Sequence, residues 1–277
     1  WEVVPMNNVA APVDAGDLSI VIPFREDAPE RRENLVAVLE RLVRDLVGAE
    51  ILVIEHAPAP SAAGLPALPG LRHVPMADAG AFHRTRMLND GIETLARRPF
   101  AASWDTDVLV HPAALASALD LLRGGAGLVY PFDGRFIEVR GPARRRVLDG
   151  ADLSALPWPD RRPRWWQRRG DVVCENEASV GGAVLFDRAA FTRTGGYHEG
   201  FVAWGFEDAE IRDRMEKLGV EVARVPGYPL FHLAHPRGRA KGGWYRSVRA
   251  NRALYREWAA LDADELAARV ADGALRA

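Results

Sequence analysis

The chain has 277 residues, of which 48% are hydrophobic and 27% are charged, and its formal net charge is −2. This length suits one large α/β domain or two small ones, and the near-neutral charge gives no reason to expect nucleic acid or a membrane surface as a partner. The single cysteine, Cys174, excludes an internal disulfide and a zinc site built from cysteines. No apolar run reaches the roughly 18 residues of a membrane span. Residues 1–4 lack the features of a secretory signal, so we expect a cytoplasmic protein.

The first part of the chain follows a strand–helix–strand pattern. Residues 1–17 are rich in Pro, Asn and Ala, which predicts an irregular lead-in. Residues 18–22 form a short apolar run that residues 23–25 break, as expected for a buried parallel strand. Apolar residues then recur every three or four positions over residues 30–47, which predicts a helix with one buried face. A second strand at residues 51–54 closes the unit, with both strands in one sheet.

The same alternation continues along the chain. The pattern predicts strands at residues 71–74, 100–110 and 127–130, and helices at residues 82–97 and 112–122. Alternating strands and helices are typical of the α/β class, in which helices cover the faces of a mostly parallel sheet. Because ligands bind beyond the carboxyl ends of such strands, we expect one crevice to receive both residues 23–25 and residues 105–107.

Asp105 and Asp107 interrupt the apolar run of residues 100–110. In an extended segment, residues two apart point to the same side, so we expect both carboxylates to enter one cleft. Carboxylates held in this way can bind a hard divalent cation, which would neutralise the phosphates of a nucleotide. The alternative is a strand that ends in an Asp-rich turn, since Asp favours turns through its own backbone hydrogen bonds.

Residues 132–178 differ in composition because arginine is dense and tryptophan is interleaved. The residues concerned are Arg135, Arg140, Arg144, Arg145, Arg146, Arg161, Arg162, Arg164, Arg168, Arg169, Trp158, Trp165 and Trp166. Such a surface can grip anionic groups and stack on planar or sugar faces, which favours an anionic or aromatic acceptor as a hypothesis. The alternative is a solvated loop whose charges only keep it soluble. Nucleic acid is the weaker alternative, since no nucleic-acid-binding module is visible.

The second half returns to regular structure. The pattern predicts strands at residues 180–186 and 222–225, helices at residues 187–192 and 207–218, and a largely helical C-terminus from residue 244. Gly181 and Gly182 permit close approach of a ligand, with a bulge or tight bend as the alternative.

The composition and the predicted elements divide the chain into four parts. We expect an irregular lead-in over residues 1–17, a nucleotide-sugar-binding half over residues 18–131, an acceptor-binding and catalytic half over residues 132–240, and a C-terminal helical segment over residues 241–277.

Glu207, Asp208 and Glu210 fall in the first turn of the helix expected at residues 207–218. Acidic residues there suit the helix dipole, and this alone would explain them. Trp204 precedes them, however, and a tryptophan beside carboxylates is a common way to hold a sugar. A carboxylate here could also remove a proton from an acceptor hydroxyl.

His232 and His235 lie three residues apart near the end of the catalytic half. Neutral imidazole is a competent ligand for transition metals, so either residue could complete a metal site begun by Asp107. A lone histidine here would more often be a structural residue. With two histidines, and a cation already expected, we favour a ligand role for one of them.

Several short motifs occur in a fixed order along the chain. They are Ile22-Pro23-Phe24-Arg25, Phe82-His83-Arg84-Thr85-Arg86-Met87-Leu88-Asn89, Asp105-Thr106-Asp107, Gly181-Gly182, Gly195-Gly196-Tyr197 and Trp204-Gly205-Phe206-Glu207-Asp208. Together they resemble the β-1,4-galactosyltransferase family and the related catalytic domains of bacterial chondroitin-type polymerases. These proteins are inverting, metal-dependent glycosyltransferases with the GT-A fold. The resemblance spans roughly residues 18–240 and implies a single α/β domain with a Rossmann-like, mostly parallel central sheet.

The resemblance also implies roles for individual residues. Asp107 would bind Mn²⁺ or Mg²⁺ with the support of Asp105, and His232, or else His235, would be the other protein ligand. The residues implied for the nucleotide-sugar donor are Pro23, Phe24, Arg25, Phe82, Arg84, Asp105, Thr106 and Trp204. The residues implied for the acceptor are Glu207, Trp204 and Gly182, and Asp208 matches the general base.

Two departures from the family pattern concern the donor. The family's Gly-Gly before the acidic pair is Gly205-Phe206 here, so the sugar can be a hexose or an N-acetylhexosamine, and the family's second arginine after Pro-Phe-Arg is Asp27. We therefore expect an inverting hexosyltransferase that moves a sugar from a UDP-sugar to a hydroxyl of a carbohydrate or other acceptor. The alternatives are a retaining GT-A transferase and a carbohydrate- or nucleotide-binding module without turnover. A sugar-phosphate nucleotidyltransferase would want a Gly-rich loop after the first strand, which residues 23–25 do not supply.

Overall fold

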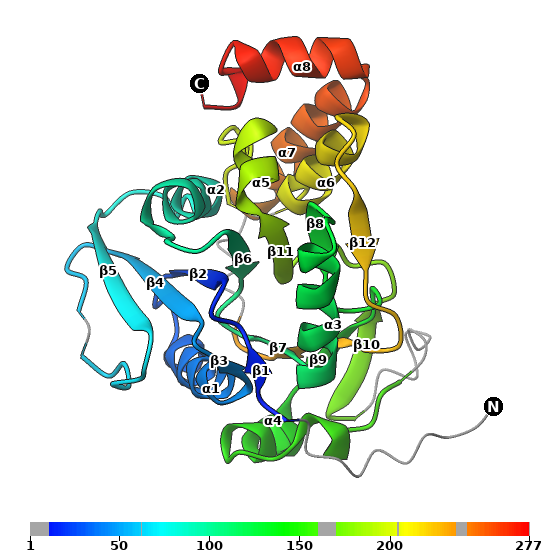
Figure 1. The fold of residues 1–277 in the computed structure, drawn as a ribbon. Helices are drawn as coiled ribbons and strands as arrows, with labels where there is room; N and C mark the ends of the chain where they lie inside the picture. The colour runs from blue at the N-terminus through cyan, green and yellow to red at the C-terminus, as the bar shows by residue number, and fades with distance from the viewer. Residues whose placement is uncertain (1–10, 62, 160–169, 204, 237–242, 277) are drawn as a thin grey trace.

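The structure is a computed structural model that describes residues 11–61, 63–159, 170–203, 205–236 and 243–276. Two larger β-sheets, one two-stranded sheet and the helices around them make up this part of the chain (Figure 1). Trp204, Trp165 and Trp166, which the sequence analysis singles out, lie outside the described residues.

The large sheet has seven strands in the order β12-β8-β11-β6-β2-β4-β5. All neighbours are parallel except β11, which runs antiparallel to both β6 and β8. The predicted α/β class with a mostly parallel central sheet is therefore confirmed. The strands are β2 (Leu18–Phe24), β4 (Glu50–Ala57), β5 (Leu71–Ala77), β6 (Phe100–Trp104), β8 (Leu128–Tyr130), β11 (Ala183–Asp187) and β12 (Val222–Arg224).

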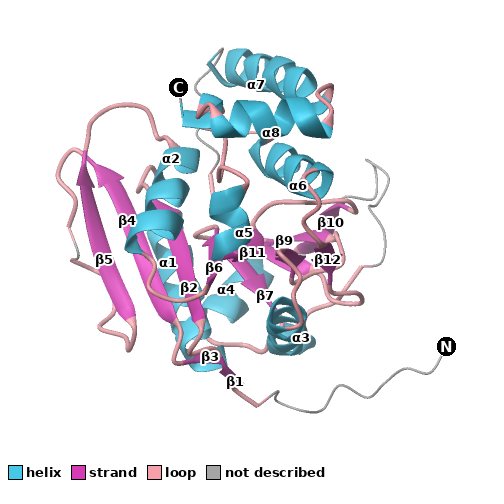
Figure 2. Ribbon diagram, turned by 45° about the horizontal axis from the view of Figure 1, so that its top comes forward, coloured by secondary structure: helices cyan, strands magenta, loops and turns pink. Residues whose placement is uncertain are grey.

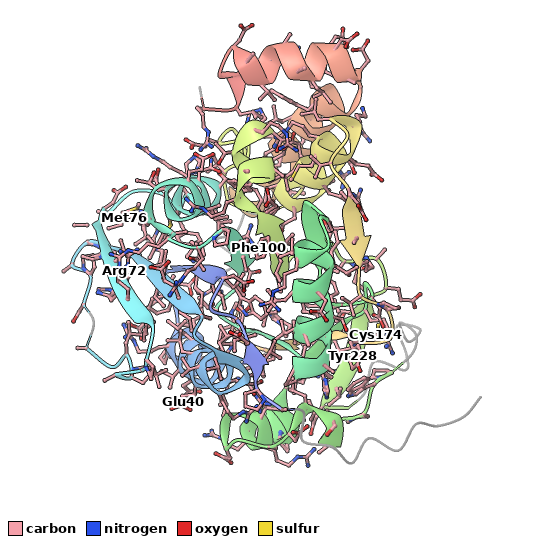
Figure 3. All side chains as sticks on the ribbon, in the orientation of Figure 1. Glu40, Arg72, Met76, Phe100, Cys174 and Tyr228 are labelled. Carbon is pink, nitrogen blue, oxygen red and sulfur yellow. The ribbon has the colours of Figure 1, made fainter. Side chains whose placement is uncertain are left out.

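A second sheet of four strands lies in the order β10-β9-β13-β7. Its strands are β7 (Val108–Val110), β9 (Phe136–Val139), β10 (Val172–Asn176) and β13 (Leu230–Leu233). The short strands β1 (Val13–Asp14) and β3 (Leu46–Val47) form a separate parallel pair. Cys174 is buried on β10 (Figure 3).

Helices flank the sheets, as Figure 2 shows from a second direction. They are α1 (Pro29–Asp45), α2 (Arg84–Asn89), the π-helix η1 (Asp90–Leu95), α3 (Pro112–Arg123), α4 (Gly141–Leu148), the 3-10 helix η2 (Leu153–Ala155), α5 (Arg188–Arg193), α6 (Glu207–Lys217), α7 (Gly243–Ala259), α8 (Ala263–Ala271) and the 3-10 helix η4 (Ala274–Arg276). Among the described residues, no helix has both the length and the apolar character needed to cross a bilayer.

One expectation from the sequence is wrong. Residues 100–110 are not one strand: β6 belongs to the large sheet and β7 to the small one, and residues 105–107 form the connection between them. Residues 132–178, for which a solvated loop was one of the alternatives, contribute β9, α4 and β10. Within this segment Arg144 donates to Asn34 and pairs with Glu33, so its guanidinium holds α4 against α1.

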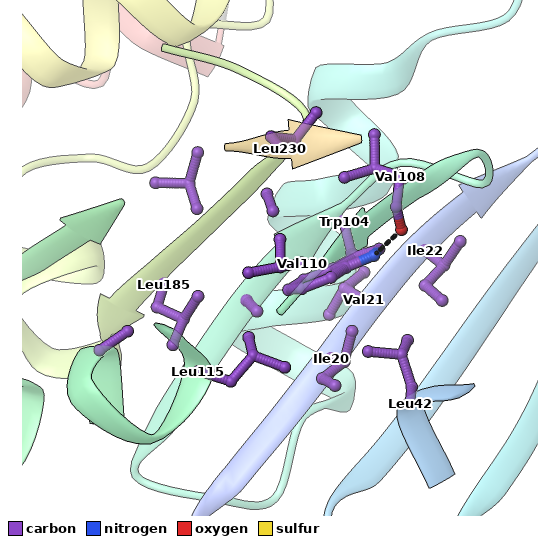
Figure 4. Packing of buried hydrophobic residues seen from close by; sticks show 14 of the residues in the cluster. Ile20, Val21, Ile22, Leu42, Trp104, Val108, Val110, Leu115, Leu185 and Leu230 are labelled. Carbon is purple, nitrogen blue, oxygen red and sulfur yellow. Dashed lines mark hydrogen bonds between the residues drawn. The ribbon is translucent and has the colours of Figure 1, made fainter. Parts of the chain in front are cut away.

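One core cluster includes residues of both sheets, and Trp104, which is 1% exposed, is the largest of the fully buried side chains (Figure 4). Its indole packs among apolar residues of several elements, and its Nε1 donates to the carbonyl oxygen of Val108 at 3.0 Å. A buried indole N–H needs such a partner. This hydrogen bond spans the connection between β6 and β7 and therefore fixes how the chain leaves the large sheet.

Gly91 lets η1 approach the large sheet closely. A Cβ at this position would collide with the side chain of Val21 on β2 and would meet Ile54 on β4 at 3.0 Å. The preceding helix α2, which carries Arg84, depends on this close contact for its position.

We predict that Gly91→Ala lowers the free energy of unfolding by about 1–3 kcal/mol, because the added methyl overpacks the core. The matched variant Thr94→Ala removes an exposed side chain in the same turn and should change stability by less than about 0.5 kcal/mol. Chemical denaturation of both variants measures the difference. Equal stability of the two variants would contradict the close packing of η1.

Candidate functional site

The site is built around the connection between β6 and β7, which carries Asp105 and Asp107. Three hydrogen bonds hold it: Trp104 Nε1 to Val108, the amide of Asp105 to the carbonyl of Gly182 at 2.8 Å, and the amide of Leu233 to the carbonyl of Asp107 at 2.7 Å. The two carboxylates therefore follow a turn rather than an extended strand, which was the alternative interpretation of the sequence. They reach different neighbours as a result.

Arg84, at the start of α2, lies among three carboxylates that come from distant parts of the chain. Its Nη2 lies 3.0 Å from Oδ1 of Asp105, and its Nη1 lies 3.4 Å from Oδ1 of Asp208 and 3.7 Å from Oε1 of Glu207. Burial alone would lower the pKa of Arg84, but Asp105 and Asp208 raise it well above its ordinary value. The structure thus joins segments far apart in the sequence through one guanidinium. It places Arg84 among carboxylates, whereas the resemblance implies a role in binding the nucleotide-sugar donor.

Asp208 lies in the first turn of α6 and is held from three directions. The hydroxyl of Tyr197 donates to Oδ1 of Asp208 at 3.2 Å, and Arg84 approaches the same oxygen. A Cβ at Gly181 would collide with Oδ2. The space that a side chain at Gly181 would fill is therefore occupied by the carboxylate of Asp208.

Glu207 is buried beside a second carboxylate, Asp208. Burial, followed by the neighbouring Asp208, raises its pKa to about 7, and Arg84 opposes this only in part. Its Oε2 is buried and has no hydrogen-bond partner among the described residues. A buried carboxylate oxygen without a donor is costly, so this atom is suited to accept a hydrogen bond from a bound ligand.

Asp107 meets two histidines on the other side of the turn. Its Oδ1 lies 3.6 Å from Nε2 of His232, and its Oδ2 lies 3.1 Å from Nε2 of His235. One ligand atom from each residue lies within 4.8 Å of the others. The strand register explains the contact with His232, because β13 pairs His232 with Val108, the residue that follows Asp107.

These three residues fit a divalent cation. Burial would raise the pKa of Asp107, but His232, His235 and Arg31 lower it to about 2, so the carboxylate is ionised. Nδ1 of His235 lies 2.9 Å from the carbonyl oxygen of Pro236. A hydrogen on Nδ1 would leave the lone pair of Nε2 free to bind a cation beside Asp107, and such outer contacts commonly orient metal-binding histidines. One carboxylate and two imidazoles suit manganese or another first-row metal.

Arg31 is a residue of this site that the sequence analysis missed. It lies in the first turn of α1, and its Nη1 is 3.1 Å from Nε2 of His235 and 3.7 Å from Oδ2 of Asp107. Asp27, which replaces the second arginine of the family pattern, lies 3.2 Å from Nε of Arg31. A cation in the first turn opposes the helix dipole, and this unfavourable position is the signal that could have revealed it.

Asn34, one turn further along α1, fixes the helix relative to β13. Its buried Nδ2 donates to the carbonyl of Leu233 at 2.9 Å, and its Oδ1 accepts from Arg144. The same helix therefore positions Arg31 and the strand that carries His232.

The remaining residues implied for the nucleotide lie at or near the ends of β2 and β4. Pro23 and Phe24 are buried, and the guanidinium of Arg32 lies 5.3 Å from the centre of the Phe24 ring. Arg25 is partly exposed and donates to the carbonyl of Gly80 at 3.0 Å. Phe82 is also partly exposed. Of the four, Arg25 and Phe82 offer side-chain surface to a ligand.

Thr106 and Gly182 are enclosed by protein. Thr106 is 2% exposed. Gly182 has a φ of +97°, and a Cβ there would press against Leu230 and Val108. This positive φ favours glycine. The carbonyl of Gly182 accepts the hydrogen bond from the amide of Asp105, so Gly182 helps to hold the turn at residues 105–107.

Comparison with known proteins gives one sequence family and several structures. Residues 170–236 match the family described as the N-terminal domain of galactosyltransferase. A search of curated proteins finds no match. The catalytic domain of Drosophila β1,4-galactosyltransferase 7 in complex with xylobiose is 17% identical, with a TM-score of 0.49 over 89% of this chain and 82% of that chain.

Two further structures are similar. A mutant of the Drosophila enzyme in complex with manganese, UDP-Gal and xylobiose is 17% identical, with a TM-score of 0.48 over 83% of this chain and 78% of that chain. GalNAc-T7 with UDP, GalNAc and Mn²⁺ is 13% identical, with a TM-score of 0.57 over 87% of this chain and 47% of that chain.

The family match covers the part of the chain from β10 to β13, with Gly181, Glu207, Asp208, His232 and His235. It confirms the predicted resemblance to the galactosyltransferase family and the prediction that the chain is a glycosyltransferase. The likeness to GalNAc-T7 supports the GT-A-like fold.

We predict that the wild-type protein binds Mn²⁺, and that Asp107→Asn and His232→Gln each weaken this binding by more than about tenfold, because loss of a ligand costs at least as much as loss of an outer contact. Isothermal titration calorimetry without nucleotide measures the affinities. Asp149→Asn, at an exposed position on the surface, is the control and should bind like the wild type. Unchanged affinity in both site variants would remove Asp107 and His232 from the cation site.

The raised pKa of Glu207 gives a second prediction, which concerns stability. The unfolded chain ionises Glu207 near pH 4.5 and the folded protein near pH 7, so wild-type stability falls as the pH rises across this range. Glu207→Gln has no carboxyl group at this position, so its stability should not fall with pH for this reason. Relative to the wild type, its free energy of unfolding should improve by on the order of 2 kcal/mol between pH 5 and pH 8.

Urea denaturation at the two pH values tests this prediction. The control Glu216→Gln replaces an exposed carboxylate of the same helix and should differ from the wild type equally at both pH values. A pH-independent difference for Glu207→Gln as well would show that Glu207 is not destabilised by burial.

Proposed function

We propose that this glycosyltransferase moves a hexose or N-acetylhexosamine from a UDP-sugar to an acceptor hydroxyl, with inversion at the anomeric carbon and in the presence of Mn²⁺ or Mg²⁺. The observation that carries the proposal is that the two carboxylates of residues 105–107 belong to different clusters. Asp107 lies with His232 and His235, which could together hold a cation. Asp105 contacts Arg84, which also contacts Asp208.

Asp107, His232 and His235 would hold the cation at the diphosphate end of the donor. The bound cation would balance the negative charge that develops on the UDP leaving group. GalNAc-T7, whose fold is similar, was solved with UDP, GalNAc and Mn²⁺, and we propose the same classes of donor and metal here.

Asp208 would act as the general base. Tyr197 and Arg84 both engage its Oδ1, so Oδ2 is the oxygen placed to take the proton from the acceptor hydroxyl. Two fixed contacts on Oδ1 also limit rotation of the carboxylate. A base held in this way supports direct attack of the hydroxyl on the anomeric carbon from the face opposite the leaving group.

Glu207 would bind a hydroxyl of the acceptor or the donor sugar. Its buried Oε2 has no hydrogen-bond partner among the described residues, and a sugar hydroxyl would supply the missing donor. Trp204, for which the resemblance implies a place in the sugar pocket, lies outside the described residues.

The hypothesis that arginines of residues 132–178 bind an anionic acceptor now excludes Arg144. Arg144 is held by Asn34 and Glu33 on α1, whereas Arg145 and Arg146 are exposed. We propose an anionic acceptor only through the two exposed residues. Substitution of Arg145 and Arg146 together, with Arg144 kept, separates acceptor binding from the packing of α4.

We predict that Asp208→Asn lowers turnover by about 100-fold or more, the usual effect of losing a general base, while UDP binding with Mn²⁺ persists. The variant keeps the size of the side chain and the contacts of Oδ1. The control Asp272→Asn, at an exposed position on the C-terminal helices, should retain full turnover. UDP-sugars screened with simple saccharides, with release of UDP as the readout, measure the rates.

Three results would count against the proposal. Near-normal turnover by Asp208→Asn would exclude this residue as the base. NMR of the product that shows the anomeric configuration of the donor would indicate a retaining transferase. Binding of donor and acceptor without any turnover, including donor hydrolysis, would instead indicate a binding module.

A further inference from the structure

Arg31 lies inside the group of atoms expected to hold the cation. Its Nη1 is 3.1 Å from Nε2 of His235 and 3.7 Å from Oδ2 of Asp107. Its side chain is 20% exposed, and Nε lies 3.2 Å from Asp27 on the solvent side. The guanidinium is therefore held between a surface carboxylate and a buried one.

Arg31 and a divalent cation need the same atom of His235. An imidazole nitrogen has one lone pair and arginine can only donate, so in the tautomer that keeps the lone pair on Nε2, Nη1 of Arg31 is a donor to it. The contact of Nδ1 with the carbonyl of Pro236 favours the tautomer that leaves this lone pair on Nε2. A cation bound at Nε2 would displace the hydrogen bond and repel the positive guanidinium.

The displaced guanidinium would have an anionic partner close by. Oδ1 of Asp27 lies 3.2 Å from Nε of Arg31 as an ion pair without hydrogen-bond geometry, so the guanidinium can rotate its Nη groups away from His235 and keep this carboxylate beside it. A guanidinium fork matches phosphate oxygens with two parallel hydrogen bonds. The diphosphate of the donor would lie against the same cation and so within reach of α1.

We propose that Arg31 occupies the cation site before the metal does, and that metal binding transfers its guanidinium to the donor diphosphate. This inference rests on the proposed function, because it assigns a further donor-positioning residue to the same site. Arg31 lowers the affinity for the metal alone and raises the affinity for UDP once the metal is bound. The effects on metal affinity and on UDP affinity have opposite signs. A purely structural role of Arg31 would instead weaken the binding of both ligands in a variant.

Calorimetry on Arg31→Gln tests the proposal with two ligands. The affinity for Mn²⁺ alone should rise by about tenfold, the change expected when one charge-assisted hydrogen bond no longer competes. The affinity for UDP at saturating Mn²⁺ should fall by about tenfold, since a charge-assisted contact with phosphate is lost. Arg31→Lys keeps the charge without the fork and should lie between Arg31→Gln and the wild type in both titrations.

The matched control is Arg44→Gln in the last turn of the same helix. Arg44 pairs with its neighbour Asp45 and is half-exposed, so this variant should bind Mn²⁺ and UDP like the wild type. Thermal unfolding of each variant verifies that the protein titrated is folded, and the Lys variant carries the test if Arg31→Gln does not fold.

The outcomes separate this inference from the proposed function. Tighter Mn²⁺ binding with weaker UDP binding in Arg31→Gln supports the exchange. Unchanged or weaker Mn²⁺ binding in that variant overturns it, while the proposed function stands if the wild type binds both ligands. A wild-type protein that binds neither Mn²⁺ nor UDP overturns both.

Discussion

The site depends on one turn of three residues, 105–107, which carries the chain from the large sheet to the small one. The turn is fixed from both sheets: Trp104 bridges it through its indole, and Gly182 and Leu233 bind its backbone. Because the two carboxylates leave the turn in different surroundings, each has its own neighbours. Asp105 pairs with Arg84, and Asp107 lies beside two histidines and Arg31. In the function we propose, this separation would keep the cation site at Asp107 apart from the base at Asp208, although the two lie on either side of one turn.

The parts of this arrangement that are local in sequence could be predicted. Apolar runs and helical spacing predict β2, α1 and β4, because each element buries one face or both faces whatever the rest of the chain does. Acidic residues at the start of α6 and the pair His232 and His235 could be recognised by their chemistry. The family resemblance, confirmed by the match over residues 170–236, depended on the order of such motifs.

The parts that depend on distant contacts could not be predicted. Residues 100–110 contain no Gly or Pro, and although Asp105 and Asp107 allow a turn, nothing local shows that β6 and β7 lie in different sheets. β9 and α4 are short, α4 is rich in arginine, and their stability comes from packing on β13 and α1 rather than from propensity. Arg31 acquires its role from His235, which lies 204 residues away along the chain.

The most direct test of the account is anomalous diffraction at the manganese edge from crystals grown with Mn²⁺ and UDP. The account predicts one manganese peak bonded to Asp107, His232 and His235, with the diphosphate beside it and with Arg84, Glu207 and Asp208 across the turn and outside the coordination sphere. A manganese ion bonded to Asp105 or Asp208, or bound away from Asp107, would contradict it.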